Sequence, residues 1–156
     1  HYKRLIITGP ECSGKTTLCQ KIVKHRAHVD FFVPEYARLL VEQLQRTLTA
    51  DDLPSVFYGQ YIRMQLWDHK KETVLYDTDL LSSIVYAEIY FGQAPDYAID
   101  LWQSTLVESF YLLINSTIPW QADENQRSEE SLSKETFERI KYYLDTHQAN
   151  YTIIDY

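Results

Sequence analysis

The sequence has few of the features that stabilise small secreted or metal-binding proteins. Its only cysteines are Cys12 and Cys19, which lie on a stretch that contains a helix pattern. If both belong to one helix, their Cα atoms are about 10 Å apart, beyond the roughly 7 Å limit for a disulfide. The sequence contains no Cys-x-x-Cys pair and no His-Glu-x-x-His run. We therefore expect a reduced, cytoplasmic protein without structural zinc.

Long hydrophobic runs and a surplus of positive charge are also absent. No apolar stretch approaches the roughly 18 residues that a membrane-spanning helix requires. The chain has 15 basic and 22 acidic residues, which gives a formal net charge of −7. Because phosphate contacts along a nucleic acid need an excess of Lys and Arg, this balance disfavours non-specific nucleic-acid binding. We expect neither a membrane nor a nucleic-acid partner, and the sequence leaves the oligomeric state open.

What the sequence contains is typical of a globular domain. Of its 156 residues, 45% are hydrophobic and 24% are charged. A chain of this length buries about 68–70% of its unfolded surface, so it needs no cross-link to fold. We expect a single domain over residues 1–156.

Short β-branched runs alternate with stretches of helical periodicity along the chain. This order predicts βαβ units and a mostly parallel sheet with helices on both faces. A polar segment without periodicity, which contains Pro119, predicts a long surface lid loop over 116–131. The expected strands cover residues 3–8, 30–33, 73–76, 110–114 and 151–154; the expected helices cover 15–25, 36–44, 80–90, about 97–105 and two further apolar stripes, at 53–64 and 137–147.

One motif identifies a phosphate site. Residues 9–16 read Gly-Pro-Glu-Cys-Ser-Gly-Lys-Thr and fit the pattern GxxxxGK[ST], between an expected strand and an expected helix. Glycines at both ends allow the backbone to approach phosphate oxygens, and the helix start directs its positive dipole end there. The alternative, a glycine-containing turn without a nucleotide, is disfavoured by this context. The nucleotide-binding residues that we predict are Gly9, Glu11, Cys12, Ser13, Gly14, Lys15, Thr16 and Thr17.

Charged side chains at the ends of expected strands complete the predicted site. Lys15 is expected to contact the β- and γ-phosphates, and Thr16 with Asp77 to hold Mg²⁺. Asp79 follows the same strand, and its alternative role is to cap the next helix. Glu35 follows the second strand and is a candidate for the base that takes the proton of an acceptor hydroxyl, or for a ligand of a sugar hydroxyl.

Three further residues are weaker candidates. Arg38 lies one helical turn beyond Glu35 and is a candidate phosphate ligand, with a surface charge as the alternative. In the expected lid, Arg127 is a candidate for stabilising transition-state charge and Trp120 for packing on the substrate. The alternative for Arg127 is a solvated loop residue.

Other nucleotide-binding classes fit less well than a small-molecule kinase. A GTPase would carry Gly three residues after Asp77, but Leu80 occupies that position, and no NKxD motif occurs. No LSGGQ-like segment supports a transporter ATPase, and the chain is small for a motor or unfoldase ATPase. A small-molecule kinase needs a phosphate loop, an acidic group near the acceptor and a lid with cations. These three features are all predicted here.

Four blocks, at residues 9–18, 33–38, 76–81 and 118–123, together resemble the ribosylnicotinamide kinase domain of the bacterial NadR proteins. The resemblance implies a P-loop kinase-type three-layer α/β sandwich with a five-stranded parallel sheet. It also implies ATP- and Mg²⁺-dependent phosphorylation of the 5′-hydroxyl of nicotinamide riboside, a small-molecule substrate, to nicotinamide mononucleotide. By motif, Lys15 and Thr16 match the family's phosphate and magnesium positions, Glu35 and Arg38 its acceptor-side pair, and Asp77 and Asp79 its paired carboxylates.

The sequence departs from this family in the lid and at residue 34, among other places. The lid lacks the family's Gly after Trp120 and spaces Arg127 differently, and Pro34 stands where some relatives have an aromatic residue. Two alternatives therefore stay open: a kinase for another nucleoside or small metabolite, and a non-catalytic ATP-binding sensor.

Overall fold

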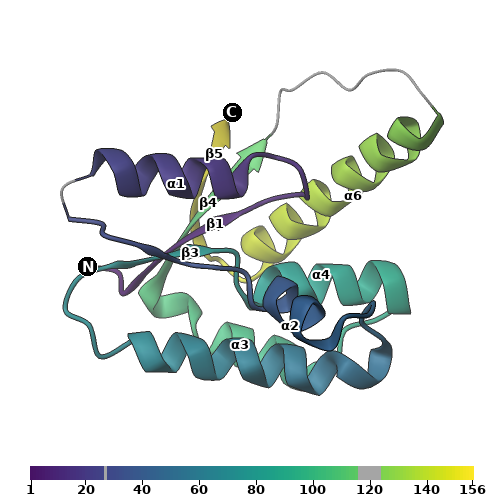
Figure 1. The fold of residues 1–156 in the computed structure, drawn as a ribbon, viewed down its shortest axis with the longest axis horizontal. Helices are drawn as coiled ribbons and strands as arrows, with labels where there is room; N and C mark the ends of the chain where they lie inside the picture. Colours follow the sequence, from purple (N-terminus) through teal and green to yellow (C-terminus); the bar gives the residue numbers. More distant parts are fainter. Residues whose placement is uncertain (27, 116–123) are drawn as a thin grey trace.

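The computed structural model describes residues 1–26, 28–115 and 124–156, and in α6 the side chains from 130 onward. A five-stranded sheet, in the order β2-β3-β1-β4-β5, runs through the centre of the molecule, and every neighbouring pair is parallel (Figure 1). The strands are β1 (Arg4–Thr8), β2 (Phe32–Val33), β3 (Val74–Asp77), β4 (Ser109–Asn115) and β5 (Asn150–Asp155). Parallel strands need crossover connections, and helices supply them here.

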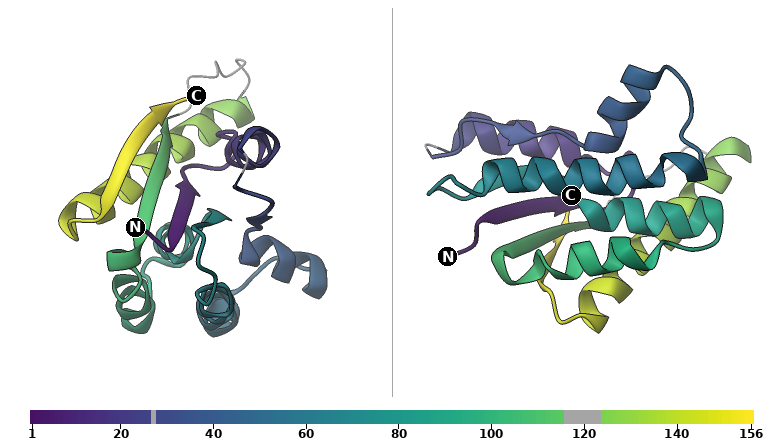
Figure 2. Two further views of the ribbon diagram at one scale, coloured as in Figure 1. Left: turned by 90° about the vertical axis from the view of Figure 1, so that its left-hand side faces the viewer. Right: turned by 90° about the horizontal axis from the view of Figure 1, so that it is seen from below.

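Helices cover both faces of the sheet, so the fold is the expected three-layer α/β sandwich (Figure 2). The helices are α1 (Lys15–His25), α2 (Tyr36–Leu44), α3 (Leu53–Trp67), α4 (Leu80–Phe91), α5 (Asp96–Gln103) and α6 (Glu124–Thr146), with short 3₁₀ turns at Ala50–Asp52 and Leu106–Glu108. Side chains alternate along β1: Ile7 packs with Cys19 of α1, whereas Ile6 packs with the helices of the other face.

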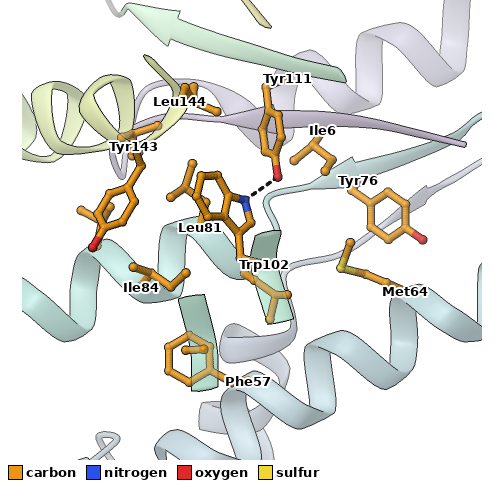
Figure 3. Close-up of a cluster of buried hydrophobic side chains, with 14 of the residues drawn as sticks. Ile6, Phe57, Met64, Tyr76, Leu81, Ile84, Trp102, Tyr111, Tyr143 and Leu144 are labelled. Atoms are coloured by element: carbon orange, nitrogen blue, oxygen red, sulfur yellow. Dashed lines mark hydrogen bonds between the residues drawn. The ribbon is translucent and has the colours of Figure 1, made fainter. Parts of the chain in front are cut away.

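The larger core lies between the sheet and α3 to α6 and is rich in aromatic side chains (Figure 3). Trp102 and Tyr111 are fully buried, and the indole N–H of Trp102 donates to the hydroxyl of Tyr111 at 2.8 Å. Tyr111 in turn donates to the carboxylate of Asp79. The polar atoms of these large rings are thus satisfied inside the core, as burial requires.

Most expected elements are confirmed, with corrections at their ends. The lid loop expected over 116–131 is wrong from Glu124 onward, because α6 begins there. Glu, Gln and Arg dominate this stretch, and they favour a helix. They form no apolar stripe, so the hydrophobic periodicity of the sequence gives no helix signal there. The second strand is shorter than expected: it is confined to Phe32–Val33, just before Pro34. Across the described ranges, no helix is both long and apolar enough to cross a membrane.

Candidate active site

The loop of residues 9–16, here called the phosphate loop, joins central strand β1 to α1 (Figure 1). Both of its glycines have positive φ angles, +149° at Gly9 and +89° at Gly14. A Cβ atom at Gly9 would lie 3.1 Å from the carbonyl oxygen of Ile114, and one at Gly14 would lie 2.7 Å from the ring of Tyr156. Any other residue would therefore strain the loop at both positions.

The start of α1 presents unneutralised positive potential to this loop. Its N-cap residue is Gly14, and the first turn carries no acidic side chain. In the described part of the chain, no side chain caps this helix end. Because the first N–H groups of a helix lack partners within the helix, they remain available to an anion. The local geometry therefore suits phosphate.

Lys15 lies at the first position of α1 and is only 8% exposed. Its Nζ donates to the carbonyl oxygen of Pro10 at 2.5 Å. Burial lowers the pKa of Lys15, while the nearby carboxylates of Glu35 and Asp77 oppose that shift. An added phosphate would favour the charged form further, because opposite charges stabilise each other. Lys15 is thus hydrogen-bonded within the phosphate loop and is also influenced by acidic side chains from outside it.

Thr16 and Asp77 form a direct contact between the phosphate loop and β3. The hydroxyl of Thr16 donates to one Asp77 oxygen at 2.7 Å. Asp77 is 1% exposed, and its other oxygen, Oδ1, has no partner among the described residues. A buried carboxylate oxygen without a partner is costly, and a cation or its water would satisfy it. One hydroxyl and one carboxylate fit Mg²⁺, which usually keeps several waters.

No richer metal site competes with this pair. Within the described ranges, no group of three or more His, Cys, Asp or Glu side chains is placed to hold a metal ion. Both cysteines are free thiols, with Cys12 exposed and Cys19 buried.

Glu35 lies directly before α2, at the end of β2, and its side chain is 20% exposed. Burial raises the pKa of Glu35; Lys15 opposes this rise, and Asp77 adds to it. Arg38 lies one turn into α2, with its guanidinium 3.6 Å from the Glu35 carboxylate and its side chain 57% exposed. The structure therefore brings Glu35 close to Lys15 and Asp77, with Arg38 at the solvent side.

Asp79 has a structural role that the sequence had left as an alternative. It is the N-cap residue of α4, where it accepts a hydrogen bond from the N–H of Leu81 at 3.1 Å. Its second oxygen accepts from the hydroxyl of Tyr111. Burial raises the pKa of Asp79 to about 6. Both oxygens are engaged within the protein, and its predicted contact with substrate stays a prediction.

Two predicted lid residues cannot be placed in this site. Trp120 lies outside the described residues. Arg127 belongs to α6, but its side chain also lies outside them. Both assignments stay predictions.

Sequence reasoning missed one residue beside the phosphate loop. The hydroxyl of Tyr86, in α4, accepts a hydrogen bond from the backbone N–H of Glu11 at 3.2 Å. With 13 tyrosines in the chain, most of them on helical stripes, no spacing distinguishes this one. Its contact depends on how α4 packs, which only the folded chain shows.

Comparison with solved structures shows that other proteins have a similar fold. A NadR protein in complex with NR is 23% identical, with a TM-score of 0.69 over 97% of this chain and 43% of the NadR chain. A NadR protein in complex with NAD and AMP-PNP is 22% identical, with a TM-score of 0.70; the match covers 99% of this chain and 44% of the NadR chain. Thymidylate kinase from Ehrlichia chaffeensis is 13% identical, with a TM-score of 0.66; the match covers 97% of this chain and 86% of the thymidylate kinase chain. The chain thus spans less than half the length of the NadR chains.

The family assignment comes from the sequence as a whole. None of the curated proteins with which the sequence was compared matches it. A protein-family model described as "AAA domain" (AAA_28) matches residues 4–156, which include the phosphate loop and all five strands. The chain therefore belongs to the AAA domain family AAA_28, with the P-loop kinase fold that its structural neighbours share.

Proposed function

We propose that this chain is an ATP-dependent kinase that phosphorylates the 5′-hydroxyl of nicotinamide riboside to give nicotinamide mononucleotide. The observation that carries the proposal is the hydrogen bond of 2.7 Å from Thr16 of the phosphate loop to the buried Asp77, beside Lys15, whose pKa is influenced by Glu35. In this proposal, a phosphate site, a cation site and a candidate base would share one end of the sheet. The fold common to this chain and the NadR protein bound to NR supports the choice of acceptor.

On the donor side, the phosphate loop would bind the triphosphate of ATP. The backbone N–H groups of the loop and of the first turn of α1 would donate to phosphate oxygens. Lys15 would exchange the Pro10 carbonyl for a phosphate oxygen and so add a full positive charge. Thr16 and Asp77 would hold Mg²⁺, which neutralises phosphate charge when bound.

On the acceptor side, Glu35 would act as the base. The acceptor oxygen bonds to the γ-phosphorus as the bond from phosphorus to the ADP oxygen breaks, and the hydroxyl proton passes to Glu35. Burial raises the pKa of Glu35, which makes it a stronger base than an exposed carboxylate. Arg38 would orient phosphate or the Glu35 carboxylate, and Asp79, Trp120 and Arg127 remain proposed substrate-side or lid residues.

Incubation of the chain with ATP, MgCl₂ and nicotinamide riboside tests the proposal. We expect equal amounts of nicotinamide mononucleotide and ADP, measured by chromatography and mass spectrometry. Parallel reactions with thymidine, thymidylate and other nucleosides test the nearest alternative, since thymidylate kinase has the same fold. Transfer only to another acceptor would replace the substrate. ATP binding without transfer to any acceptor would favour a non-catalytic sensor.

A further inference from the structure

One peptide group of the phosphate loop is held from both sides. The carbonyl oxygen of Pro10 accepts from Lys15 Nζ at 2.5 Å, and the N–H of Glu11 donates to the hydroxyl of Tyr86 at 3.2 Å. The Pro10 carbonyl and the Glu11 N–H belong to the same planar peptide unit. Its two ends therefore point to Lys15 and Tyr86, respectively.

The Tyr86 hydroxyl is held in place by a helix that packs into the core. Its helix, α4, begins with the Asp79 cap at the end of β3 and packs into the core through Ile84 and Val85, which are fully buried. Burial raises the pKa of Tyr86, and the carboxylates of Glu11 and Glu35 add to the shift. The phenol therefore stays neutral at physiological pH, and its oxygen remains an acceptor for the Glu11 N–H.

Within the loop, Lys15 holds the carbonyl end of this peptide, and the N–H end depends on Tyr86 of α4. Glu11 is exposed, and the next residue, Cys12, has a left-handed φ of +58° that non-glycine residues rarely adopt. A reversed Pro10–Glu11 peptide would turn its carbonyl away from Lys15 and its N–H away from Tyr86. An acceptor on α4 thus favours one of two orientations of a peptide that joins buried Pro10 to exposed Glu11.

We propose that Tyr86 is a positioning residue of the nucleotide site, which fixes the Pro10–Glu11 peptide and, through it, the resting position of Lys15. Its effect on nucleotide affinity rests on the proposed ATP binding. Without the hydroxyl, only a fraction of molecules would keep the binding-competent loop, and the apparent Kd would rise by the inverse of that fraction.

The test compares Tyr86→Phe with Tyr90→Phe. The second is a matched control, because Tyr90 stacks beside Tyr86 at a ring distance of 6.0 Å, is 58% exposed and has no hydrogen-bond partner for its hydroxyl in the described structure. Both variants keep the aromatic ring, so melting temperatures within about 2 °C of the wild type are expected. Calorimetry with a non-hydrolysable ATP analogue should give a Kd about three- to tenfold higher for Tyr86→Phe alone, the range of one net hydrogen bond.

A second readout does not require nucleotide. In the free protein, the backbone ¹H–¹⁵N resonance of Glu11 should shift and exchange faster in Tyr86→Phe, but not in Tyr90→Phe. An unshifted Glu11 resonance would overturn the proposal, and so would equal Kd values for Tyr86→Phe and the wild type. If the wild type itself binds no ATP analogue, the proposed kinase function fails, while the Glu11 resonance still tests the Tyr86 contact.

Discussion

Lys15 has an unusual environment for a lysine, since it is nearly buried and close to two carboxylates. We expect Lys15→Ala to lower kcat by about 100-fold or more, because the ammonium acts on charge that develops during transfer. The fold should survive, since a buried cation whose pKa is lowered contributes little to stability. Turnover assays and thermal melts check both parts. Lys24→Ala, an exposed change on the same helix, is the control, and normal turnover in Lys15→Ala would contradict the role.

The raised pKa of Glu35 makes a second prediction, on activity. If Glu35 is the base, kcat of the wild type should fall as pH drops through this raised pKa, because the carboxylate becomes protonated. Glu35→Gln should lower kcat with little change in KM and remove that limb of the pH profile. A rise in KM with kcat unchanged would instead indicate a binding role.

The same shift predicts an effect on stability. A carboxyl group with a raised pKa in the folded state binds its proton more tightly there than in the unfolded chain. The free energy of unfolding therefore falls as pH rises through the window between the unfolded value and the raised one. At pH 7, Glu35→Gln should be at least as stable as the wild type, and urea denaturation at pH 4 and pH 7 measures this. A marked loss at pH 7 would contradict the raised pKa.

Single residues were predictable where a short motif defines them. Lys15 and Thr16 follow from residues 9–16 alone, because the phosphate loop is a local structure. The sequence left the N-cap role of Asp79 as one of two alternatives. The contact of Asp79 with Tyr111, which lies 32 residues away, has no local signal in the sequence. Tyr86 gave no signal, because its contact with Glu11 spans 75 residues.

Helix α4 packs in the core and carries Tyr86, which contacts the phosphate loop. Its N-cap residue, Asp79, tests how much this helix contributes to stability. Asp79→Ala removes the bond to the Leu81 N–H and leaves the buried hydroxyl of Tyr111 without its acceptor. We expect a loss of about 1–3 kcal/mol in the free energy of unfolding, measured with urea. Asp79→Asn, which keeps a capping oxygen, should lose less. Equal stability of Asp79→Ala and wild type would contradict the cap.

The boundaries of elements show where local patterns are sufficient. The bounds of α1 and α2 agree with the expected ranges, since glycine or proline precedes each and an apolar face follows. The predicted start of the last helix was wrong, because the first turns of α6 carry no apolar stripe. Helix propensity, rather than amphipathic periodicity, is the signal there.

At the scale of the whole molecule, nucleotide binding should appear as added stability. A ligand at 100 times its Kd adds about 2.7 kcal/mol if it binds only the folded state. For a domain of this size that corresponds to a rise in melting temperature of roughly 5–10 °C. Thermal denaturation with and without Mg²⁺–ATP measures the shift, and Lys15→Ala should show a smaller one. An unchanged melting temperature in the wild type would argue for a purely structural domain.

The amino-acid sequence alone determined the α/β class, the order of strands and helices and the phosphate loop, because these depend on periodicity and on neighbours within a few residues. Only the tertiary structure decided the strand order β2-β3-β1-β4-β5, which brings Asp77 to Thr16 and Glu35 near Lys15. It also decided that both oxygens of Asp79 face partners inside the protein and that Tyr86 meets Glu11. Contacts between residues distant in the chain arise from packing, and packing has no local signature in the sequence.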